Sequence, residues 1–281
     1  MRRKSRLLAL ACAALVLAAS PGAHARQAAA GVRPLTFSDK DEAVASLFQR
    51  SPADDPYLKR LREGYKLDEV VAGGRNDYER VRAVSRWVRS RWEHNGSNVP
   101  QKPDAISILE EAAGGKRFRC SEYAVVLAAA LTSVGIPARV LGLWSEDAER
   151  RESGASHVVA EAYLADMKKW VMVDGQFDVI PTLRGRPLNA VELQRALAAS
   201  AAGLGVDTFS GAKADKYFEW VGPYLFYFLT KFDARQPAAQ QWPELCLMPL
   251  GAKQVTLFQR KHPIGHLVYT HSARAFYARP E

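Results

Sequence analysis

Apolar residues recur at helical spacing in the first half of the chain. Asn76 and Glu79 form a cap and first-turn pair for one helix. Asp104 caps a second helix that runs through Ala113, where two glycines end it. The apolar face of the first helix is marked by Val81, Val84, Val88 and Trp92, and the helix ends near Gly96.

A change of pattern follows in the middle of the chain. The run that begins at Cys120 is apolar on nearly all sides until the Gly-Ile-Pro sequence at 135–137, which predicts a helix buried within a domain. Segments 138–144, 157–164 and 169–173 are rich in valine and aromatic residues and are predicted as strands. The polar stretch 145–156 is predicted as an exposed loop between the first two strands.

The order of these patterns divides the chain into four parts. Residues 1–25 are predicted as a signal peptide, 26–74 as a helical lead-in, 75–181 as the core, and 182–281 as a C-terminal extension that packs on the core. The extension contains an alanine-rich helix capped by Asn189, strand-like runs at 255–258 and 266–270, and an aromatic block at 217–232. Packing against the core is the favoured role of this block, with a substrate groove or membrane contact as alternatives.

The N-terminus has the three parts of an export signal. Four positive charges lie within the first six residues, and the apolar stretch from Leu7 to Ala19 is too short to span a bilayer. Small residues at Ala23 and Ala25 predict cleavage after Ala25, and therefore a periplasmic or secreted protein. Lipid attachment at Cys12 and a twin-arginine signal are the weaker alternatives.

Charge excludes some classes of partner. The formal net charge of +9 falls to +5 once the four basic residues of the leader are removed. No concentrated basic block indicates nucleic-acid binding, and no further apolar stretch reaches transmembrane length. A mildly basic exported protein is compatible with an anionic cell envelope. No feature of the sequence fixes an oligomeric state.

After removal of the predicted signal peptide, which contains Cys12, two cysteines remain in the chain, Cys120 and Cys246. A disulfide scaffold would be much richer in cysteine. The two can pair with each other in an oxidising compartment. Alternatively, Cys120 is a free reactive thiol and Cys246 is a buried small apolar residue.

The position of Cys120 favours the reactive alternative. A thiol at a helix N-terminus has a lowered pKa because the unpaired N–H groups and the helix dipole stabilise the thiolate, and Lys116, Arg117 and Arg119 add positive charge. A general base and an orienting carboxylate complete a nucleophilic site. His157 and Asp174, each at an end of a predicted strand, are the candidates for these roles, and Asp166 and Asp178 are alternative carboxylates.

An acyl-transfer site also needs donors for the oxyanion. The backbone N–H of Cys120 is one, and Trp92, Asn95 or Asn98 is a candidate for the second. Gln176 is a further candidate, although a turn residue is the simpler interpretation. The spacing of His262, His266 and His271 fits no common zinc motif, so neither a metal nor a cofactor is expected.

Several of these segments together resemble the transglutaminase-like superfamily. The matching pieces are Arg-Cys-Ser-Glu-Tyr at 119–123, Gly-Ile-Pro-Ala-Arg at 135–139, His-Val-Val-Ala-Glu at 157–161 and Trp-Val-Met-Val-Asp at 170–174. The resemblance covers roughly residues 75–181. It implies a papain-like α+β core in which a buried nucleophile helix packs on an antiparallel sheet, with Cys120, His157 and Asp174 as the catalytic triad.

The same resemblance narrows the expected activity. In animal transglutaminases a tryptophan follows the nucleophile, whereas Ser121 follows it here, and no acidic loop has the pattern of a calcium site. The expected function is therefore thiol-dependent acyl transfer on the amide carbonyl of a peptide or protein, as in a cysteine peptidase or amidase of the envelope. A crosslinking transglutaminase and a non-catalytic scaffold that retains the fold are the alternatives.

Overall fold

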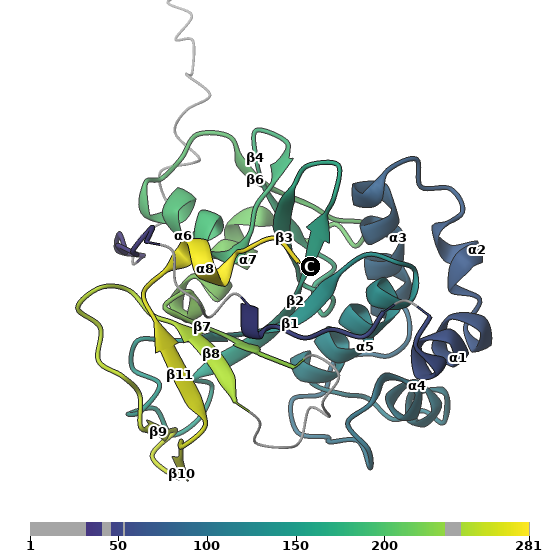
Figure 1. The fold of residues 1–281 in the computed structure, drawn as a ribbon, viewed down its shortest axis with the longest axis horizontal. Coiled ribbons are helices and arrows are strands. Elements are labelled where there is room, and N and C mark those ends of the chain that lie inside the picture. The colour runs from purple at the N-terminus through teal and green to yellow at the C-terminus, as the bar shows by residue number, and fades with distance from the viewer. Residues whose placement is uncertain (1–31, 41–45, 53, 234–242, 281) are drawn as a thin grey trace, which may run out of the picture.

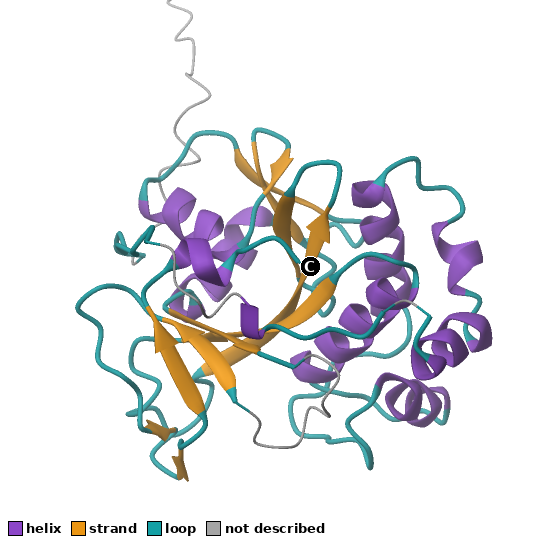
Figure 2. Ribbon diagram, in the orientation of Figure 1, coloured by secondary structure: helices purple, strands orange, loops and turns teal. Residues whose placement is uncertain are grey.

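The computed structural model describes residues 32–40, 46–52, 54–233 and 243–280. The predicted signal peptide at 1–25, with Cys12, lies outside the described residues. A central sheet separates two groups of helices, with α1 to α5 on one side and α6 to α8 on the other (Figures 1 and 2).

The first group of helices surrounds α5, the helix that begins at Cys120. Of its 14 residues, nine are buried, as its uniformly apolar sequence predicts. The predicted caps are confirmed, since Asn76 accepts from the Glu79 N–H at 2.9 Å and Asp104 from the Ser107 N–H at 3.1 Å. The bounds are α1 Pro56–Gly64, α2 Leu67–Val71, α3 Asp77–Arg89, α4 Ala105–Ala113 and α5 Cys120–Ser133.

One prediction for α3 is wrong in its extent. The helix ends at Arg89 rather than near Gly96. Beyond it, Trp92 stacks on Tyr123 with ring centroids 4.5 Å apart and packs edge-on against Phe118. Trp92 therefore lies beyond the end of α3, where its ring packs against Tyr123 of α5 and against Phe118.

The main sheet has six strands in the order β11-β8-β7-β1-β2-β3. The three predicted central strands are confirmed and pair in antiparallel fashion as neighbours. The strands of the sheet are β1 Ala138–Trp144, β2 Ser156–Leu164, β3 Lys169–Val173, β7 Tyr227–Lys231, β8 Glu244–Leu247 and β11 Leu267–Thr270.

Alternation along β1 to β3 gives the sheet two apolar faces. Ala160 and Val171 belong to the core that contains the leucines of α5, whereas Val159 and Met172 belong to the core that contains α6 and α7. Successive residues of a strand point to opposite faces, so each strand contributes to both cores. A sheet covered on both faces explains why these strands are almost continuously apolar.

The C-terminal extension is part of this sheet rather than a layer packed on it. Strand β7, within the aromatic block, pairs with β1, and β8 and β11 continue the sheet outward. The predicted boundary at 181 falls inside β4 Ile180–Leu183. The remaining elements are β5 Arg186–Pro187, α6 Ala190–Ala198, β6 Leu204–Asp207, α7 Ala214–Val221, the 3-10 helix Gly222–Tyr224, β9 Leu257–Phe258, β10 His262–Pro263 and α8 Ala273–Phe276.

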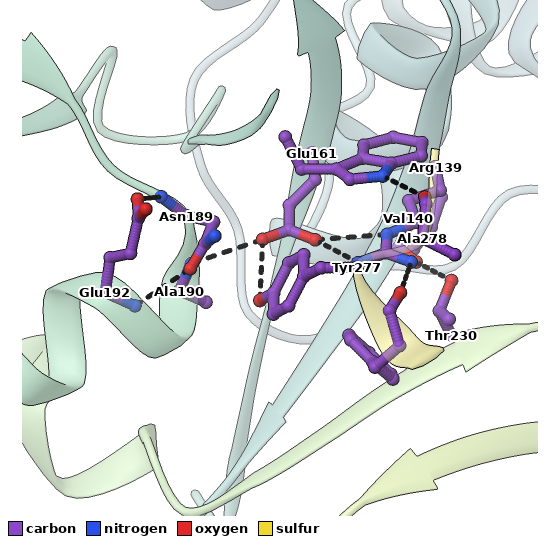
Figure 3. A network of polar contacts seen from close by, with 11 residues as sticks. Arg139, Val140, Glu161, Asn189, Ala190, Glu192, Thr230, Tyr277 and Ala278 are labelled. Carbon is purple, nitrogen blue, oxygen red and sulfur yellow. Dashed lines mark hydrogen bonds and ion pairs between the residues drawn. The ribbon is translucent and has the colours of Figure 1, made fainter. Parts of the chain in front are cut away.

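A buried polar network joins the C-terminal end of the chain to the sheet (Figure 3). Two nitrogens of Arg139 donate to Glu161 Oε2, at 3.0 and 2.6 Å. The other oxygen of Glu161 accepts from the Ala190 N–H and the Tyr277 hydroxyl. The Phe276 carbonyl accepts a third hydrogen bond from the guanidinium, at 2.8 Å.

Replacing Glu161 with leucine is expected to lower the free energy of unfolding by about 3–5 kcal/mol, because it leaves the Arg139 guanidinium buried without its anion. The side chains of Arg139 and Glu161 are only 8% and 0% exposed, so water cannot replace the carboxylate. Urea denaturation measures the loss. The double variant Arg139→Met with Glu161→Leu should recover a large part of it, and a double variant no more stable than the single one would contradict this explanation.

Candidate active site

The thiol of Cys120 lies at the first position of α5. Arg119 is the N-cap, and its backbone N–H donates to Glu122 Oε2 at 3.1 Å while its guanidinium pairs with the same carboxylate at 2.7 Å. The chain therefore enters the helix in a fixed direction. Because Cys120 is the first helical residue, its own N–H has no carbonyl partner within the helix and is available to an oxyanion.

Strand register brings the other two predicted residues together. Leu143 of β1 lies opposite His157, and the β2–β3 ladder pairs Ala160 with Val173. Continued by one residue, that ladder sets Asp174 opposite Val159. His157 and Asp174 then lie on one face as diagonal neighbours, a separation that a histidine and a carboxylate can bridge.

The three candidate residues are in contact through the imidazole. His157 Nε2 lies 2.7 Å from Asp174 Oδ2, and the ring is also hydrogen-bonded to the Cys120 thiol. The ring has only two nitrogens, so Nδ1 is the one available to the sulfur. The side chains of His157 and Asp174 are 2% and 0% exposed, which excludes water from their contact.

The Asp174 carboxylate accepts hydrogen bonds at both oxygens. Oδ1 accepts from the backbone N–H groups of Gln176 at 3.0 Å and Phe177 at 3.2 Å, within the turn that follows β3. Oδ2 accepts from the Tyr217 hydroxyl at 2.9 Å in addition to its contact with His157. These bonds fix the carboxylate and, through it, the ring of His157.

The electrostatics of the site favour a thiolate and an imidazolium. Burial opposes the charged form of His157, but the Asp174 carboxylate and the Cys120 sulfur outweigh burial and raise the pKa of His157 to about 9. Burial likewise opposes ionisation of Cys120. Its pKa is nevertheless lowered, because the sulfur accepts hydrogen bonds from His157 and from the backbone N–H of Val158. The pair can therefore exist as an ion pair at neutral pH.

The structure distinguishes between the alternative carboxylates. Asp178 Oδ2 accepts from the backbone N–H groups of Phe209 and Ser210, both at 2.8 Å, and so holds a neighbouring loop. Asp166 lies exposed in the turn between β2 and β3. Of the three candidate carboxylates, Asp174 is the one hydrogen-bonded to His157.

The predicted oxyanion donors lie in a loop beside the entry to α5. Asn95 donates its backbone N–H to the Phe118 carbonyl at 2.8 Å, and the Asn98 amide donates to the Arg117 carbonyl at 2.8 Å. The Asn98 amide is therefore already used to hold this loop. The indole N–H of Trp92 is buried without a hydrogen-bond partner. Gln176 lies in the turn after β3, where its N–H binds Asp174. The second oxyanion donor stays a prediction.

Aromatic residues enclose His157, and two of them belong to the block 217–232, for which a substrate groove was the alternative to core packing. The rings of Trp220 and Tyr224, from α7 and the 3-10 helix, lie 4.7 and 6.3 Å from the imidazole, and Phe177 lies 6.1 Å away. Trp220 is itself exposed, so the enclosure meets solvent there. The aromatic block therefore serves both core packing and the site, but no local pattern distinguishes its site residues from its core residues.

A second histidine lies close enough to interact with the first. Partial burial and the positive charge of His157 lower the pKa of the His94 imidazole, although part of this side chain is exposed to solvent. A bridge between His94 and Phe118 holds it beside the segment that leads to Cys120. His94 was not among the predicted site residues, although it lies in the same loop as Asn95 and Asn98.

The other cysteine and histidines lie apart from this chemistry. Cys120 and Cys246 are both free, so the alternative of a disulfide between them is wrong for this structure. Burial raises the pKa of Cys246, which keeps its thiol neutral. His271 contacts the Met248 carbonyl and His266 lies 3.9 Å from Glu244. Within the described ranges, no three His, Cys, Asp or Glu side chains are grouped as metal ligands, and no helix is long and apolar enough to cross a membrane.

Replacing Tyr217 with phenylalanine is expected to slow turnover by about 10- to 100-fold, the effect of one hydrogen bond to a charged group. Without the hydroxyl, the Asp174 carboxylate attracts the imidazolium proton more strongly, so the alkaline limb of the pH profile should move upward from about 9. A pH series of amide turnover measures the shift, because the alkaline limb reports the loss of the His157 proton. Tyr227→Phe is the matched control, since its buried hydroxyl binds the Lys253 carbonyl instead. Equal effects of the two variants would contradict a positioning role.

Comparison with known proteins agrees with this geometry. Residues 66–175 match the family model described as the transglutaminase-like superfamily. A candidate cysteine protease from Cytophaga hutchinsonii is 18% identical, with a TM-score of 0.36 over 60% of this chain and 53% of that one. The periplasmic domain of TgpA from Pseudomonas aeruginosa is 18% identical, with a TM-score of 0.32 over 46% of each chain.

Red sea bream transglutaminase is 14% identical, with a TM-score of 0.32 over 54% of this chain and 31% of that one. The matches thus span about half or less of the length of these three proteins. No curated protein matches the chain. The family match covers the helix of Cys120 and the strands of His157 and Asp174. Residues 66–175 are thus similar to the core of the transglutaminase-like superfamily.

Proposed function

We propose that this protein is a cysteine-dependent amidase or peptidase that acts on peptide or protein amides in the cell envelope. The observation that carries the proposal is the position of His157 between the Cys120 thiol and the Asp174 carboxylate. A nucleophile, a base in contact with it and a group that orients the base are the parts of a covalent acyl-transfer site.

The first half of the reaction uses the ion pair. The Cys120 thiolate attacks the amide carbonyl carbon, and the carbonyl oxygen becomes an oxyanion opposite the Cys120 N–H. The His157 imidazolium then gives its proton to the amide nitrogen, the C–N bond breaks, and the amine leaves. The acyl group remains bound to Cys120 as a thioester.

The second half releases the acyl group. His157, now neutral, takes a proton from water, and the hydroxide attacks the thioester carbonyl. The C–S bond breaks, the product leaves as a carboxylic acid, and the thiolate and imidazolium are restored. An amine in place of water would give a new amide, which is the crosslinking alternative. Asp174 and Tyr217 hold the imidazole in one orientation throughout.

The place of action rests on the N-terminal sequence. The charged and apolar leader with its predicted cleavage after Ala25 supports export, and we propose that the mature enzyme is periplasmic or secreted. Both cysteines of the described residues are free, and Cys246 is buried, so Cys120 is the thiol of this part of the chain that must stay reduced outside the cytoplasm.

The pH dependence of Cys120 alkylation tests the proposal without a known substrate. With iodoacetamide, the rate is expected to rise at a pH below the usual thiol pKa of about 8.5, because the pKa of Cys120 is lowered. Amide turnover should then fall above about pH 9, where His157 loses the proton that the leaving group needs. In His157→Ala the alkylation profile should move toward that of an ordinary thiol.

Peptide mapping after alkylation separates Cys120 from Cys246. Labelling of Cys120 no faster than that of Cys246, together with no effect of His157→Ala, would exclude the catalytic assignment and favour a scaffold. Envelope peptides and protein amides can then be screened for three products. New peptide termini indicate a peptidase, ammonia indicates an amidase, and a new isopeptide bond indicates crosslinking.

A further inference from the structure

Helix α7 and the 3-10 helix that follows it carry three aromatic rings beside the triad. The Tyr217 hydroxyl donates to Asp174 Oδ2 at 2.9 Å, so the position of this segment relative to the carboxylate is fixed. Trp220 follows about one helical turn later, with its ring centroid 6.5 Å from that of Tyr217, and the ring of Tyr224 lies 5.4 Å from that of Trp220. The hydrogen bond that orients the carboxylate therefore also sets where Trp220 lies.

Trp220 contacts both the imidazole and the solvent. Its ring centroid lies 4.7 Å from that of His157, at an interplanar angle of 78°, and 4.6 Å from that of Phe177. Trp220 is 38% exposed, whereas His157 is only 2% exposed and the rings of Phe177 and Tyr224 are part-buried. The apolar surface that adjoins the imidazole therefore opens to solvent at Trp220.

The chemistry of the proposed reaction determines which part of a substrate meets this surface. His157 Nε2 is held by Asp174, so Nδ1 carries the proton that the leaving amine receives. The amide nitrogen must therefore come within hydrogen-bond reach of the imidazole, and the substituent on that nitrogen lies among the groups around the ring. The carbonyl oxygen is directed instead to the N–H of Cys120, at the start of α5. Trp220 thus adjoins the part of the substrate that leaves as the amine.

The groups around Trp220 favour an apolar side chain on that amine. Phe177 and Tyr224 pack against its ring. The adjacent carboxylate of Glu219 pairs with Lys216 at 3.2 Å, so it is already engaged by a cation. A cation over an exposed indole gains about 2- to 5-fold in affinity, whereas burial of a large apolar side chain gains about 10- to 100-fold. Apolar packing is therefore the larger effect at this position.

We propose that Trp220 is a specificity-determining residue, which binds the side chain of the residue on the amine side of the scissile bond. That side chain is aromatic or large and aliphatic, so the substrate class of the site is an amide whose nitrogen belongs to an apolar amino acid residue. The inference rests on the proposed function, because it takes His157 as the group that gives a proton to the leaving amine.

Capture of an acyl group by added amines tests the amine side alone. p-Nitrophenyl acetate loads an acetyl group on Cys120 as a thioester and releases p-nitrophenolate. An amino acid amide then attacks the thioester carbonyl, a C–N bond forms, the C–S bond breaks, and His157 takes the proton that the amine gives up. This step is the reverse of acylation by an amide, so the amine binds where a leaving amine departs. Water competes for the same thioester and gives acetate.

Glycinamide, leucinamide, phenylalaninamide and argininamide are the four amines to compare. Mass spectrometry measures the ratio of N-acetyl product to acetate, and each ratio is divided by the concentration of unprotonated amine. For the unaltered protein, the ratio with phenylalaninamide is expected to exceed that with glycinamide by about tenfold or more, and leucinamide should also be favoured. Argininamide should stay within about fivefold of glycinamide.

Two variants and a control assign the preference to the indole. Trp220→Ala should bring the ratio for phenylalaninamide to within about twofold of that for glycinamide. Trp220→Glu should do the same and should raise the ratio for argininamide above both, because a carboxylate at that place attracts the guanidinium. Trp87→Ala is the matched control and should keep the preference, since Trp87 is a part-exposed tryptophan of α3 that packs against Tyr65 with ring centroids 5.9 Å apart.

The outcomes separate the two proposals. Acetylation of Cys120 followed by equal capture of all four amines, or by capture of none, would overturn the inference and leave the proposed function standing. A preference for phenylalaninamide that either Trp220 variant retains would also overturn it, because a residue that only supports the imidazole changes aminolysis and hydrolysis together. If Cys120 is not acetylated at all, both proposals are overturned. A preference that both Trp220 variants lose and Trp87→Ala keeps supports the inference.

Discussion

Replacing Cys120 with alanine is expected to lower turnover by about four orders of magnitude or more, because no other group at the site can form the covalent intermediate. The variant should keep its fold, since alanine at the first position of α5 leaves the contact between Arg119 and Glu122 in place. Release of p-nitrophenolate from p-nitrophenyl acetate, followed by single-turnover mass spectrometry of the acylated protein, measures the loss and does not require the natural substrate.

Cys246→Ala is the matched control for this variant. Cys246 lies fully buried on β8, and burial raises the pKa of its thiol, so its loss affects packing rather than chemistry. Turnover by Cys246→Ala at a temperature where it remains folded should equal that of the unaltered protein. Substantial acylation in Cys120→Ala, lost again when Cys246 is removed, would show that Cys246 rather than Cys120 is the nucleophile.

Replacing Asp174 with asparagine is expected to reduce turnover by about 10³- to 10⁴-fold, the range found when the orienting carboxylate of a triad is neutralised. The Asp174 charge is what raises the pKa of His157 to about 9 against the effect of burial. Without it, the imidazolium loses its proton at lower pH, and the thiolate loses its partner. Alkylation of Cys120 should therefore fall most on the acid side of its pH profile and change least on the alkaline side, where ionisation of the thiol no longer depends on the imidazolium.

Asp178→Asn is the control for a nearby buried carboxylate. Asp178 holds the N–H groups of Phe209 and Ser210 and does not contact the imidazole, so its replacement should affect the stability of that loop. The alkylation profile of Cys120 should be unchanged. If Asp178→Asn and Asp174→Asn shift the profile equally, the orienting role would not belong to Asp174.

Elements whose signals are local were predictable from the sequence. The caps at Asn76 and Asp104, the buried helix from Cys120 and the three strands from Ala138 to Val173 depend on residues a few positions apart. Side-chain capping and the period of apolar residues act over that same range. The alternation along the strands also indicated positions for His157 and Asp174 at strand ends.

Contacts between distant segments were not predictable in this way. The Tyr217 hydroxyl reaches Asp174 across 43 positions of sequence. Strand β7, which lies within the aromatic block, pairs with β1, which occurs much earlier in the sequence. A run of aromatic residues has similar composition whether it forms a strand, a core layer or the wall of a site, so its role depends on which surface it meets.

By itself, the sequence determined the nucleophile helix, the three central strands and the candidates for thiol, base and carboxylate, since helix termini and strand periods are set by neighbouring residues. The tertiary structure decided which carboxylate contacts His157, and that the C-terminal segment extends the sheet and encloses the imidazole. The pKa values of Cys120 and His157 follow from the same packing, because burial and the distance between charges exist only once the chain has folded.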